Sequence, residues 1–406
     1  MAGPAQKRLV TITAAFLAIC LLLVSSHHYY ALPDRAPQNG VNTTPASSAH
    51  PSNKDTAAAD TSYEADEERF GHSPDNVAKP GHADHNDVPE RVANPKNNGK
   101  HPDGREKLAY ATLFSATLDQ DEDLENDKYF ASVRILVWQL LHNPDTRTTD
   151  IDVVVMVTPS VSKSRRDRLE RDGAIVYPVE YLHIDKSWAR PAQPQWIDIF
   201  TKLRVWEMTQ YSRVLLMDTD SMLVRPLDGI FQDPAAQIQP TKHMENYTAI
   251  EGVAPLPPTH LLASLSEVWD SYHEFPPADG TGLKKYGYFN AGFFMLAPSI
   301  AAFNHYRSFL DIPNSFDSKY MEQNLLNQIH AWGGPMPWQE LNYTWNIRCP
   351  TDADIEKGLV SIHEKWWTQP YLYNNDKTKA WLKSRRWEMK GWYDAYDRFA
   401  HRDKDE

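Results

Sequence analysis

The chain has 406 residues and a formal net charge of −12, and its composition is not uniform along its length. This acidic balance, with no basic stripe, argues against nucleic acid as a partner. The two cysteines are Cys20 and Cys349, so we expect no disulfide within the folded part, whose stability must come from a hydrophobic core.

An uncharged apolar run extends from Leu9 to Ser26, directly after Lys7 and Arg8. As a helix its 18 residues would reach about 27 Å, close to the thickness of an endoplasmic reticulum bilayer. We therefore expect a cytoplasmic tail over 1–8 and a transmembrane signal anchor over 9–26. The protein would be a single-pass type II protein of the Golgi or endoplasmic reticulum membrane, with the rest of the chain lumenal. A cleaved signal peptide is the alternative, because small residues close the run.

Residues 27–105 are dominated by Pro, Asn, Ser, Ala, His and Asp, with almost no apolar periodicity. Such a segment cannot bury enough surface to offset the entropy of ordering, so we expect a disordered lumenal stem. N-glycosylation sequences would be available in a lumenal chain at Asn42, Asn246 and Asn342. The folded domain is then expected over 106–406.

The first part of this domain alternates between strand and helix patterns. Buried strands are predicted over Lys107–Phe114, Ile151–Thr158 and Ala174–Val179, and helices over Lys128–Leu141 and Ser162–Asp172. This alternation predicts a parallel sheet with crossover helices, and therefore the α/β class.

A further helix is predicted over Trp196–Tyr211, directly before a buried strand over Val214–Met217. After it the pattern loosens into Pro-rich loops from Pro234 to Pro277. The remaining predicted elements are a strand in Tyr288–Ser299, helices over Ile300–Leu310 and Ser318–Trp332, a short strand in Gly358–Trp367 that ends on His363, and a terminal helix over Trp381–Ala400.

The spacing Asp-x-Asp occurs six times, and the surroundings distinguish the occurrences. Asp218 and Asp220 end an apolar run, at the carboxyl end of a strand, where parallel sheets bind ligands. Two carboxylates there repel each other unless a cation lies between them, so we predict a metal site. A polar turn that caps the strand is the alternative. The other pairs are expected in solvated acidic loops or turns: Asp119/Asp121, Asp121/Asp123, Asp150/Asp152, Asp352/Asp354 and Asp403/Asp405.

Four separated stretches, in this order, resemble glycosyltransferase family 8, the glycogenin-like enzymes: "IFTKLRVWEMTQYSRVLLMDTDSMLVRPLDGIF", "YFNAGFFMLAPS", "MEQNLLN" and "IHEKWW". The resemblance covers about Leu108 to Trp367. It implies a GT-A fold, in which a Rossmann-like, mostly parallel sheet flanked by helices forms a single catalytic domain. It also implies a nucleotide-diphosphate-sugar donor, a divalent cation that is usually manganese, and transfer with retention of anomeric configuration.

By this resemblance Asp218, Asp220 and His363 hold the metal, which neutralises charge on the departing diphosphate. Mixed carboxylate and imidazole ligands suit manganese. His363 must be neutral to bind, so metal affinity is expected to fall as the pH drops toward about 6. A histidine at the edge of the core is the other interpretation of His363.

The resemblance also assigns residues to the donor. Leu113, Ser115 and Tyr129 match positions that hold the uridine, although an acidic insertion separates the first two from the third. Lys202 matches a lysine that reaches the donor, and its charge complements a diphosphate; an exposed helical lysine is the alternative.

Five further residues match positions around the transferred sugar. Asn290, Ala291 and Gly292 match the family's Asn-Ser-Gly, where short side chains let the sugar approach closely. Glu322 and Gln323 fall where the family carries Asp-Gln beside the reacting carbon. Asn290, Glu322 and Gln323 are therefore the expected catalytic residues, although glutamate is one methylene longer than aspartate.

The segment after His363 departs from the family pattern. The family's lysine that grips the diphosphate comes six residues after the histidine, where this chain has Gln369. Lys365 comes two residues after His363. Either Lys365 replaces that lysine through a different loop, or the contact between a lysine and the diphosphate is lost.

We therefore expect a metal-dependent retaining hexosyltransferase. It would move N-acetylglucosamine, glucose or galactose from a UDP-sugar to a glycan, glycoprotein or other hydroxyl acceptor. A non-catalytic UDP-sugar-binding scaffold is one alternative. A metal-dependent phosphoesterase is another, although such enzymes generally use two metals and the sequence shows no second cluster of carboxylates and histidines.

Overall fold

The computed structural model describes residues 99–115 and 123–402, except 246, 269, 279–281, 284, 370, 371, 373 and 374. The expected tail and anchor, most of the expected stem, Asn42 and Asn246 lie outside the described residues. In the part of the chain that is described, no helix has both the length and the apolar character to cross a membrane. At the start of the described residues, Lys100 forms a β-bridge with Glu106.

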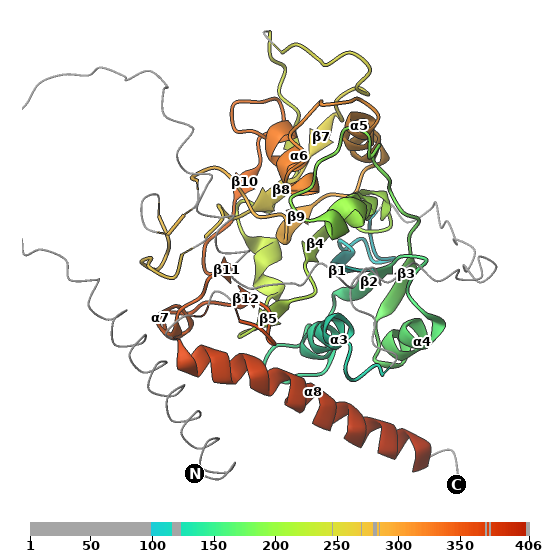
Figure 1. Cartoon of the computed structure of the whole chain (residues 1–406), viewed down its shortest axis with the longest axis vertical. Coiled ribbons are helices and arrows are strands. Elements are labelled where there is room, and N and C mark those ends of the chain that lie inside the picture. The colour runs from blue at the N-terminus through green and yellow to red at the C-terminus, as the bar shows by residue number, and fades with distance from the viewer. Residues whose placement is uncertain are drawn as a thin grey trace, which may run out of the picture. The chain divides into compact units, whose positions relative to one another are not determined.

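A seven-stranded sheet forms the centre of the fold, with the strand order β10-β8-β9-β4-β1-β2-β3 (Figure 1). The strand β1 is parallel to β2 and β4, and β2 is parallel to β3, whereas β9 is antiparallel to both β4 and β8. The predicted α/β class with a mostly parallel sheet is confirmed. The strands are β1 (Leu108–Phe114), β2 (Asp152–Val157), β3 (Ile175–Pro178), β4 (Arg213–Met217), β8 (Leu262–Ser264), β9 (Phe293–Leu296) and β10 (Gln339–Glu340).

Helices cover the sheet, and several of them begin at a capping side chain. The side chains of Asp127, Ser162 and Ser299 accept backbone N–H groups at the starts of α3, α4 and α5. The segment predicted as a helix over Trp196–Tyr211 is instead a 3₁₀ helix, η1 (Pro194–Glu207). The other helices are α3 (Lys128–Leu141), α4 (Lys163–Arg171), η2 (Asp228–Gln232), α5 (Ile300–Leu310), α6 (Met321–Ile329), α7 (Asp352–Glu356) and α8 (Asp376–Arg402).

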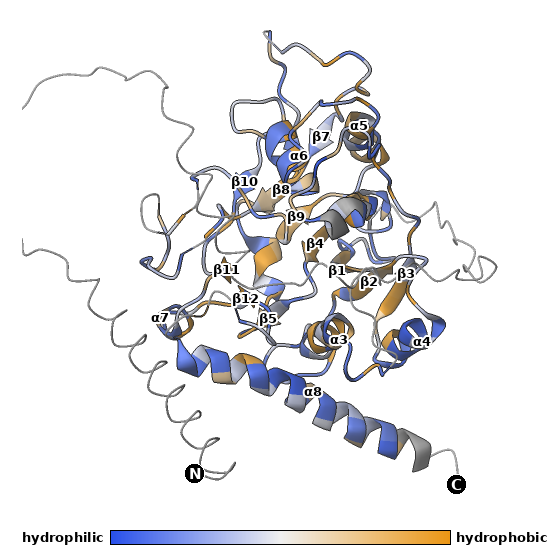
Figure 2. Ribbon diagram, in the orientation of Figure 1, coloured by the Kyte–Doolittle hydropathy of each residue, from blue (hydrophilic) through white to orange (hydrophobic). Residues whose placement is uncertain are grey.

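Both faces of the sheet are buried, which explains the continuous apolar run in β4. Val214 and Leu216 belong to a core cluster shared with η1, α5 and α6, whereas Leu215 and Met217 belong to a second cluster shared with α3 and α4. Successive side chains of a strand point to opposite faces, so a strand covered on both sides needs apolar residues throughout. Figure 2 shows this hydrophobic character in the central strands and the hydrophilic character of much of α4 and α8.

A smaller three-stranded sheet, with the order β11-β12-β5, lies beside the end of β4. Its strands are β11 (Ile347–Arg348), β12 (Ser361–His363) and β5 (Ser221–Leu223), and β5 pairs with β12 so that Ser221 lies opposite His363. The Asp218–Asp220 turn therefore leads from one sheet into the other.

Two expectations about loops are wrong. The Pro-rich region from Pro234 to Pro277 contains three strands, β6 (Gln239–Pro240), β7 (Thr259–His260) and β8, and the last lies within the central sheet. Asp354, expected in a solvated acidic turn, is 1% exposed. Its side chain completes a capping box with Thr351 and lies 3.0 Å from Nε2 of His273. Strands of two or three residues are too short to show a period, and a buried cap depends on partners distant in the sequence.

Candidate metal centre

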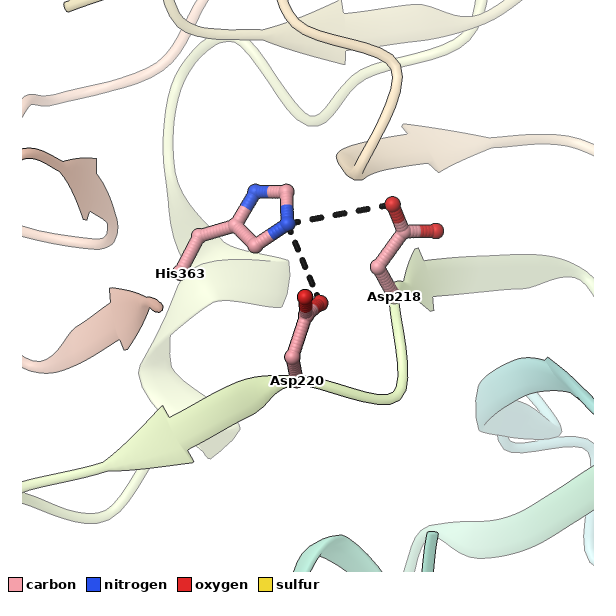
Figure 3. A group of neighbouring side chains, drawn as sticks. All are labelled: Asp218, Asp220 and His363. Atoms are coloured by element: carbon pink, nitrogen blue, oxygen red, sulfur yellow. Dashed lines mark ion pairs between the residues drawn. The ribbon is translucent and has the colours of Figure 1, made fainter. Parts of the chain in front are cut away.

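The two sheets bring the three predicted ligands together (Figure 3). Nε2 of His363 lies 3.1 Å from Oδ1 of Asp220 and 3.8 Å from Oδ2 of Asp218. One ligand atom from each of the three side chains lies within 4.8 Å of the others. Asp218 follows the end of β4, Asp220 precedes β5, and His363 ends β12, so the group depends on the β5–β12 pairing.

These donors fit a divalent cation. Ligand atoms bound at about 2.1–2.5 Å and at right angles around one ion lie about 3.0–3.5 Å apart, which is close to the two measured separations. Two carboxylates and one imidazole suit manganese and similar dications, and a bound dication would neutralise negative charge on a diphosphate. Within the described residues no other group of three His, Cys, Asp or Glu side chains meets the same distance limit.

The charges in this group depend on one another. Burial raises the pKa of the Asp220 carboxyl, but His363 and Lys365 lower it more, and the net pKa lies below its ordinary value. Burial lowers the pKa of the His363 imidazole, but Asp220 and Asp218 raise it above its ordinary value. Without a cation the imidazole is therefore stabilised in its charged form. A metal ion must displace that proton in order to bind.

Gly292 allows the imidazole to lie where it does. A Cβ atom at this position would lie 2.3 Å from Cε1 of His363 and 2.8 Å from Oδ1 of Asn290. The Gly292 carbonyl also accepts the backbone N–H of Asp218 at 2.8 Å. Gly292 thus touches two of the three ligand residues, and its lack of a side chain is a steric requirement of the site.

A network of hydrogen bonds with the buried side chains of Glu267 and Arg348 holds the Asn290 amide in place. Oδ1 of Asn290 accepts the Gly292 N–H at 2.8 Å, and its Nδ2 donates to Oε1 of Glu267 at 3.1 Å. Nη1 of Arg348 donates to the same Glu267 oxygen at 2.7 Å. Arg348 in β11 lies beside His363 in the strand register. Sequence reasoning missed Glu267 and Arg348, because neither lies in a recognisable motif and their partners are distant in the sequence.

Lys202 connects the metal group to α6. Its Nζ lies 2.7 Å from Oδ1 of Asp218 and 3.0 Å from Oε1 of Glu322. Burial lowers the pKa of Lys202, but the two carboxylates raise it well above its ordinary value. Burial raises the pKa of Glu322, and Lys202 offsets part of this. The alternative of an exposed helical lysine is wrong, because Lys202 is 5% exposed.

The first turn of α6 is tied to the segment that leads into β9. Oε1 of Gln323 accepts the Ala291 N–H at 3.0 Å, and its Nε2 donates to the Tyr288 hydroxyl at 2.9 Å. The preceding Met321 has a φ of +46°, a strained backbone conformation for a side chain of this size. The structure therefore places Gln323 beside Ala291, while the neighbouring Glu322 faces Lys202.

The three residues expected at the uridine lie near the same edge of the sheet. The last register pair of β1 and β4 is Ala111 with Leu216, two residues before Leu113 and Asp218 respectively. Ser115 follows β1, and its Oγ accepts the hydroxyl of Thr158 at 3.1 Å. The ring of Tyr129 contacts that of Trp367, four residues after His363, with centroids 5.1 Å apart. The acidic insertion lies mostly outside the described residues.

No family model matches the chain. An uncharacterised protein of Schizosaccharomyces pombe is 26% identical over 64% of this chain and 74% of its own length. Galactinol synthase 1 of Solanum lycopersicum is 23% identical over 60% of this chain and 72% of its own length. These comparisons support a glycosyltransferase.

Two solved glycosyltransferase structures align at low similarity. The galactosyltransferase LgtC aligns with 15% identity and a TM-score of 0.41, over 70% of this chain and 95% of its own. The bifunctional glycosyltransferase WbbM aligns with 13% identity and a TM-score of 0.39, over 66% of this chain and 47% of its own.

The segment after His363 contains two residues that could replace the family's diphosphate-binding lysine, Lys365 and Gln369. Nζ of Lys365 lies 4.0 Å from Oδ2 of Asp220, and its side chain is 40% exposed. Gln369 instead is buried, with a φ of +51°, and its amide donates to the Lys379 carbonyl at the start of α8. Gln369 therefore holds α8, and Lys365 is the basic residue that this segment places near Asp220, in addition to Lys202 beside Asp218.

Proposed function

We propose that this chain is a retaining glycosyltransferase of family 8, with a GT-A fold, a UDP-sugar donor and a divalent cation, manganese by preference. The observation that carries the proposal is the convergence of Asp218, Asp220 and His363 from two different sheets. A single strand with a polar turn would not bring an imidazole from the end of another strand against both carboxylates. The galactinol synthases among the relatives support the same reaction class.

In the proposed reaction an acceptor hydroxyl oxygen forms a bond to the anomeric carbon of the donor. The bond from that carbon to the phosphate oxygen breaks with its electron pair, and the acceptor proton passes to the departing UDP. Retention means that the new bond forms on the face from which UDP leaves. N-acetylglucosamine, glucose and galactose are the candidate sugars, and a glycan, a glycoprotein or another hydroxyl compound is the acceptor.

The residues of this chain contribute in four ways. Lys202 holds Asp218 and Glu322 in place and supplies positive charge at the end of β4. Asn290, Gln323 and the backbone around Ala291 form the wall that would face the sugar. Lys365, whose Nζ lies 4.0 Å from Oδ2 of Asp220, would contact the diphosphate. Leu113, Ser115 and Tyr129 would hold the uridine.

The experiment is a donor screen on the full-length chain in detergent. UDP-glucose, UDP-galactose and UDP-N-acetylglucosamine are each incubated with and without MnCl₂, and UDP release and the anomeric configuration of the product are measured. We expect one donor to release UDP in a manganese-dependent way and to give a product of unchanged configuration. Binding of a donor without release of UDP would favour the scaffold. Release of UMP and sugar 1-phosphate would favour a phosphoesterase, and a product of inverted configuration would exclude the retaining mechanism.

We further propose that residues 9–26 anchor the protein in the Golgi or endoplasmic reticulum membrane, with the catalytic domain in the lumen. The uncharged run after Lys7 and Arg8 supports this. Replacing residues 1–30 by a cleavable secretion signal should release an active protein into the medium. A protein that stays bound to membranes after this replacement would contradict the anchor.

A further inference from the structure

Two exposed aromatic side chains contact each other next to the segment that leads into the site. Tyr286 is 51% exposed and Trp332, three residues after α6, is 40% exposed. Their ring centroids lie 5.0 Å apart at an angle of 75°. The two rings thus form one aromatic surface, and no residue assigned to the metal or the donor belongs to it.

The indole of Trp332 is fixed from the inside of the protein. It packs on Trp338, which is 1% exposed, with centroids 5.2 Å apart. On another side it lies against the backbone of Gly287, where a Cβ atom would lie 3.1 Å from the ring and where φ is +80°. A side chain at 287 would displace the indole. A large ring held in this way loses little conformational entropy when a ligand binds to it.

Hydrogen bonds connect this surface to the site. The Gly287 N–H donates to Oγ of Ser266 at 3.0 Å, and the Phe289 N–H donates to Oδ1 of Asn327 in α6 at 3.0 Å. Residues 287–291 therefore run along α6 from the aromatic surface to Ala291, which is bonded to Gln323. Ser266 also lines one pocket together with Asn290 and His363. A molecule that extends from the reacting centre along this segment would reach Trp332.

Polar groups that suit hydroxyls lie beside the rings. Oε1 of Glu340 accepts the hydroxyls of Ser266 at 2.7 Å and Tyr343 at 2.6 Å. Burial and the hydrogen bond to Glu340 raise the pKa of Tyr343, and the nearby phenol of Tyr286 adds to the increase. A pyranose ring has an apolar C–H face and a rim of hydroxyls, and the combination of flat aromatic rings with a carboxylate and phenols matches both.

We propose that Tyr286 and Trp332 form an acceptor subsite on which a sugar ring of a glycan acceptor stacks, at least one residue away from the hydroxyl that is glycosylated. The proposal rests on the proposed glycosyltransferase function. It assigns the acceptor class: an oligosaccharide, bound along residues 286–291, is preferred over a monosaccharide of the same type.

The test compares short and long acceptors. Transfer from the active UDP-sugar is measured for the full-length chain with glucose and maltotriose, N-acetylglucosamine and chitotriose, and mannose and mannotriose. We expect at least one trisaccharide to have a lower KM than its monosaccharide. Tyr286→Ala and Trp332→Phe should raise the trisaccharide KM about five- to tenfold and the monosaccharide KM much less. Thermal unfolding of each variant shows whether it is folded.

Matched controls lie on α8, which is far from α6 in Figure 1. Trp387 is 63% exposed and Tyr396 is 46% exposed, and Trp387→Ala and Tyr396→Ala should leave both KM values unchanged. Equal increases for monosaccharide and trisaccharide in the Tyr286 and Trp332 variants would overturn the subsite, and so would KM values that do not change. If the wild type instead prefers a peptide acceptor and these variants reduce that preference, the surface binds a different partner, and the sugar subsite is also overturned.

Failure of the proposed function gives a different result. If the wild-type chain releases no UDP from any donor, with or without acceptor, the glycosyltransferase itself is excluded. Saturation-transfer NMR with the three trisaccharides then tests the stacking alone. Saturation transfer to the ring C–H protons of a trisaccharide, seen with the wild type and lost in Tyr286→Ala, would support a sugar-binding surface. Absence of this transfer in the wild type would overturn it.

Discussion

The two halves of the described domain differ in the length and regularity of their strands, although both contain buried ion pairs, such as Arg165 with Asp127 in the first half. From β1 to η2 the chain forms regular strands and helices whose apolar side chains fill both faces of the sheet. From β6 to β12 the strands have two to four residues, and buried polar pairs join segments that are distant in the sequence. Examples are Glu267 with Arg348, His273 with Asp354, and Asp233 with the indole of Trp345.

The metal group lies where these halves meet. Asp218 and Asp220 follow β4 of the regular half, and His363 ends a three-residue strand of the irregular half. A regular sheet can position its own carboxylates by backbone pairing and hydrophobic burial. The imidazole depends on a short strand whose position is supported by buried polar contacts, and substitutions in each half should therefore have different consequences.

The largest effect is expected at Asp220. Asp220→Asn is nearly isosteric, so the fold should persist, but one charged ligand is lost, and activity should fall by about 10³-fold. Manganese binding, followed by calorimetry, should weaken in parallel. Exposed Asp394→Asn on α8 is the control and should have no effect. Wild-type activity in Asp220→Asn would remove this residue from the ligand set.

The next effect tests the polar support of the irregular half. Glu267→Leu leaves Arg348 buried without its carboxylate, which should lower the free energy of unfolding by about 3 kcal/mol in urea titrations. Glu356→Gln, in a pair with Lys377 at a side-chain exposure of 68%, should change it little. A Glu267 variant as stable as the wild type would mean that this half is not held by its buried pairs.

A smaller effect is expected from a substitution that disturbs the metal group and leaves the fold intact. Gly292→Ala places a methyl group against the His363 imidazole, so the ring must shift, and activity and manganese affinity should each fall about 10- to 100-fold. Gly333→Ala is the matched control, because no atom lies within 4 Å of the added carbon. Unchanged manganese affinity in Gly292→Ala would contradict the steric requirement at this position.

The smallest effect concerns pH. Burial, together with a smaller contribution from nearby His260, lowers the pKa of His330 to about 3. The unfolded chain takes up this proton near the ordinary pKa of about 6.5, so the stabilisation is complete above that pH and is lost as the pH falls toward 3. His330→Gln should therefore reduce the slope of unfolding free energy against pH between 6 and 4 by up to ~1.4 kcal/mol per unit. An unchanged slope would contradict the assignment.

Sequence reasoning succeeded where an element is long and its pattern local. The predicted helix over Lys128–Leu141 has the bounds of α3, and the predicted helix over Ile300–Leu310 has those of α5. It failed for η1, because apolar spacing does not distinguish a 3₁₀ from an α-helix, and for β5, β8, β10 and β11, which have only two or three residues. The three ligands were identified from the Asp-x-Asp context and the family resemblance, not from the short strand that holds His363.

By itself the sequence determined the α/β class, the position of the paired aspartates at the end of a buried strand, and the residue types available for a metal. These features follow from periodicity and from the chemistry of side chains close together in the chain. Only the tertiary structure decided that Lys202 is buried between Asp218 and Glu322, that Gln369 faces α8, and that Glu267 and Arg348 stand behind Asn290. Such contacts join residues up to 120 positions apart, as Lys202 and Glu322 are, and the packing of the whole chain brings them together.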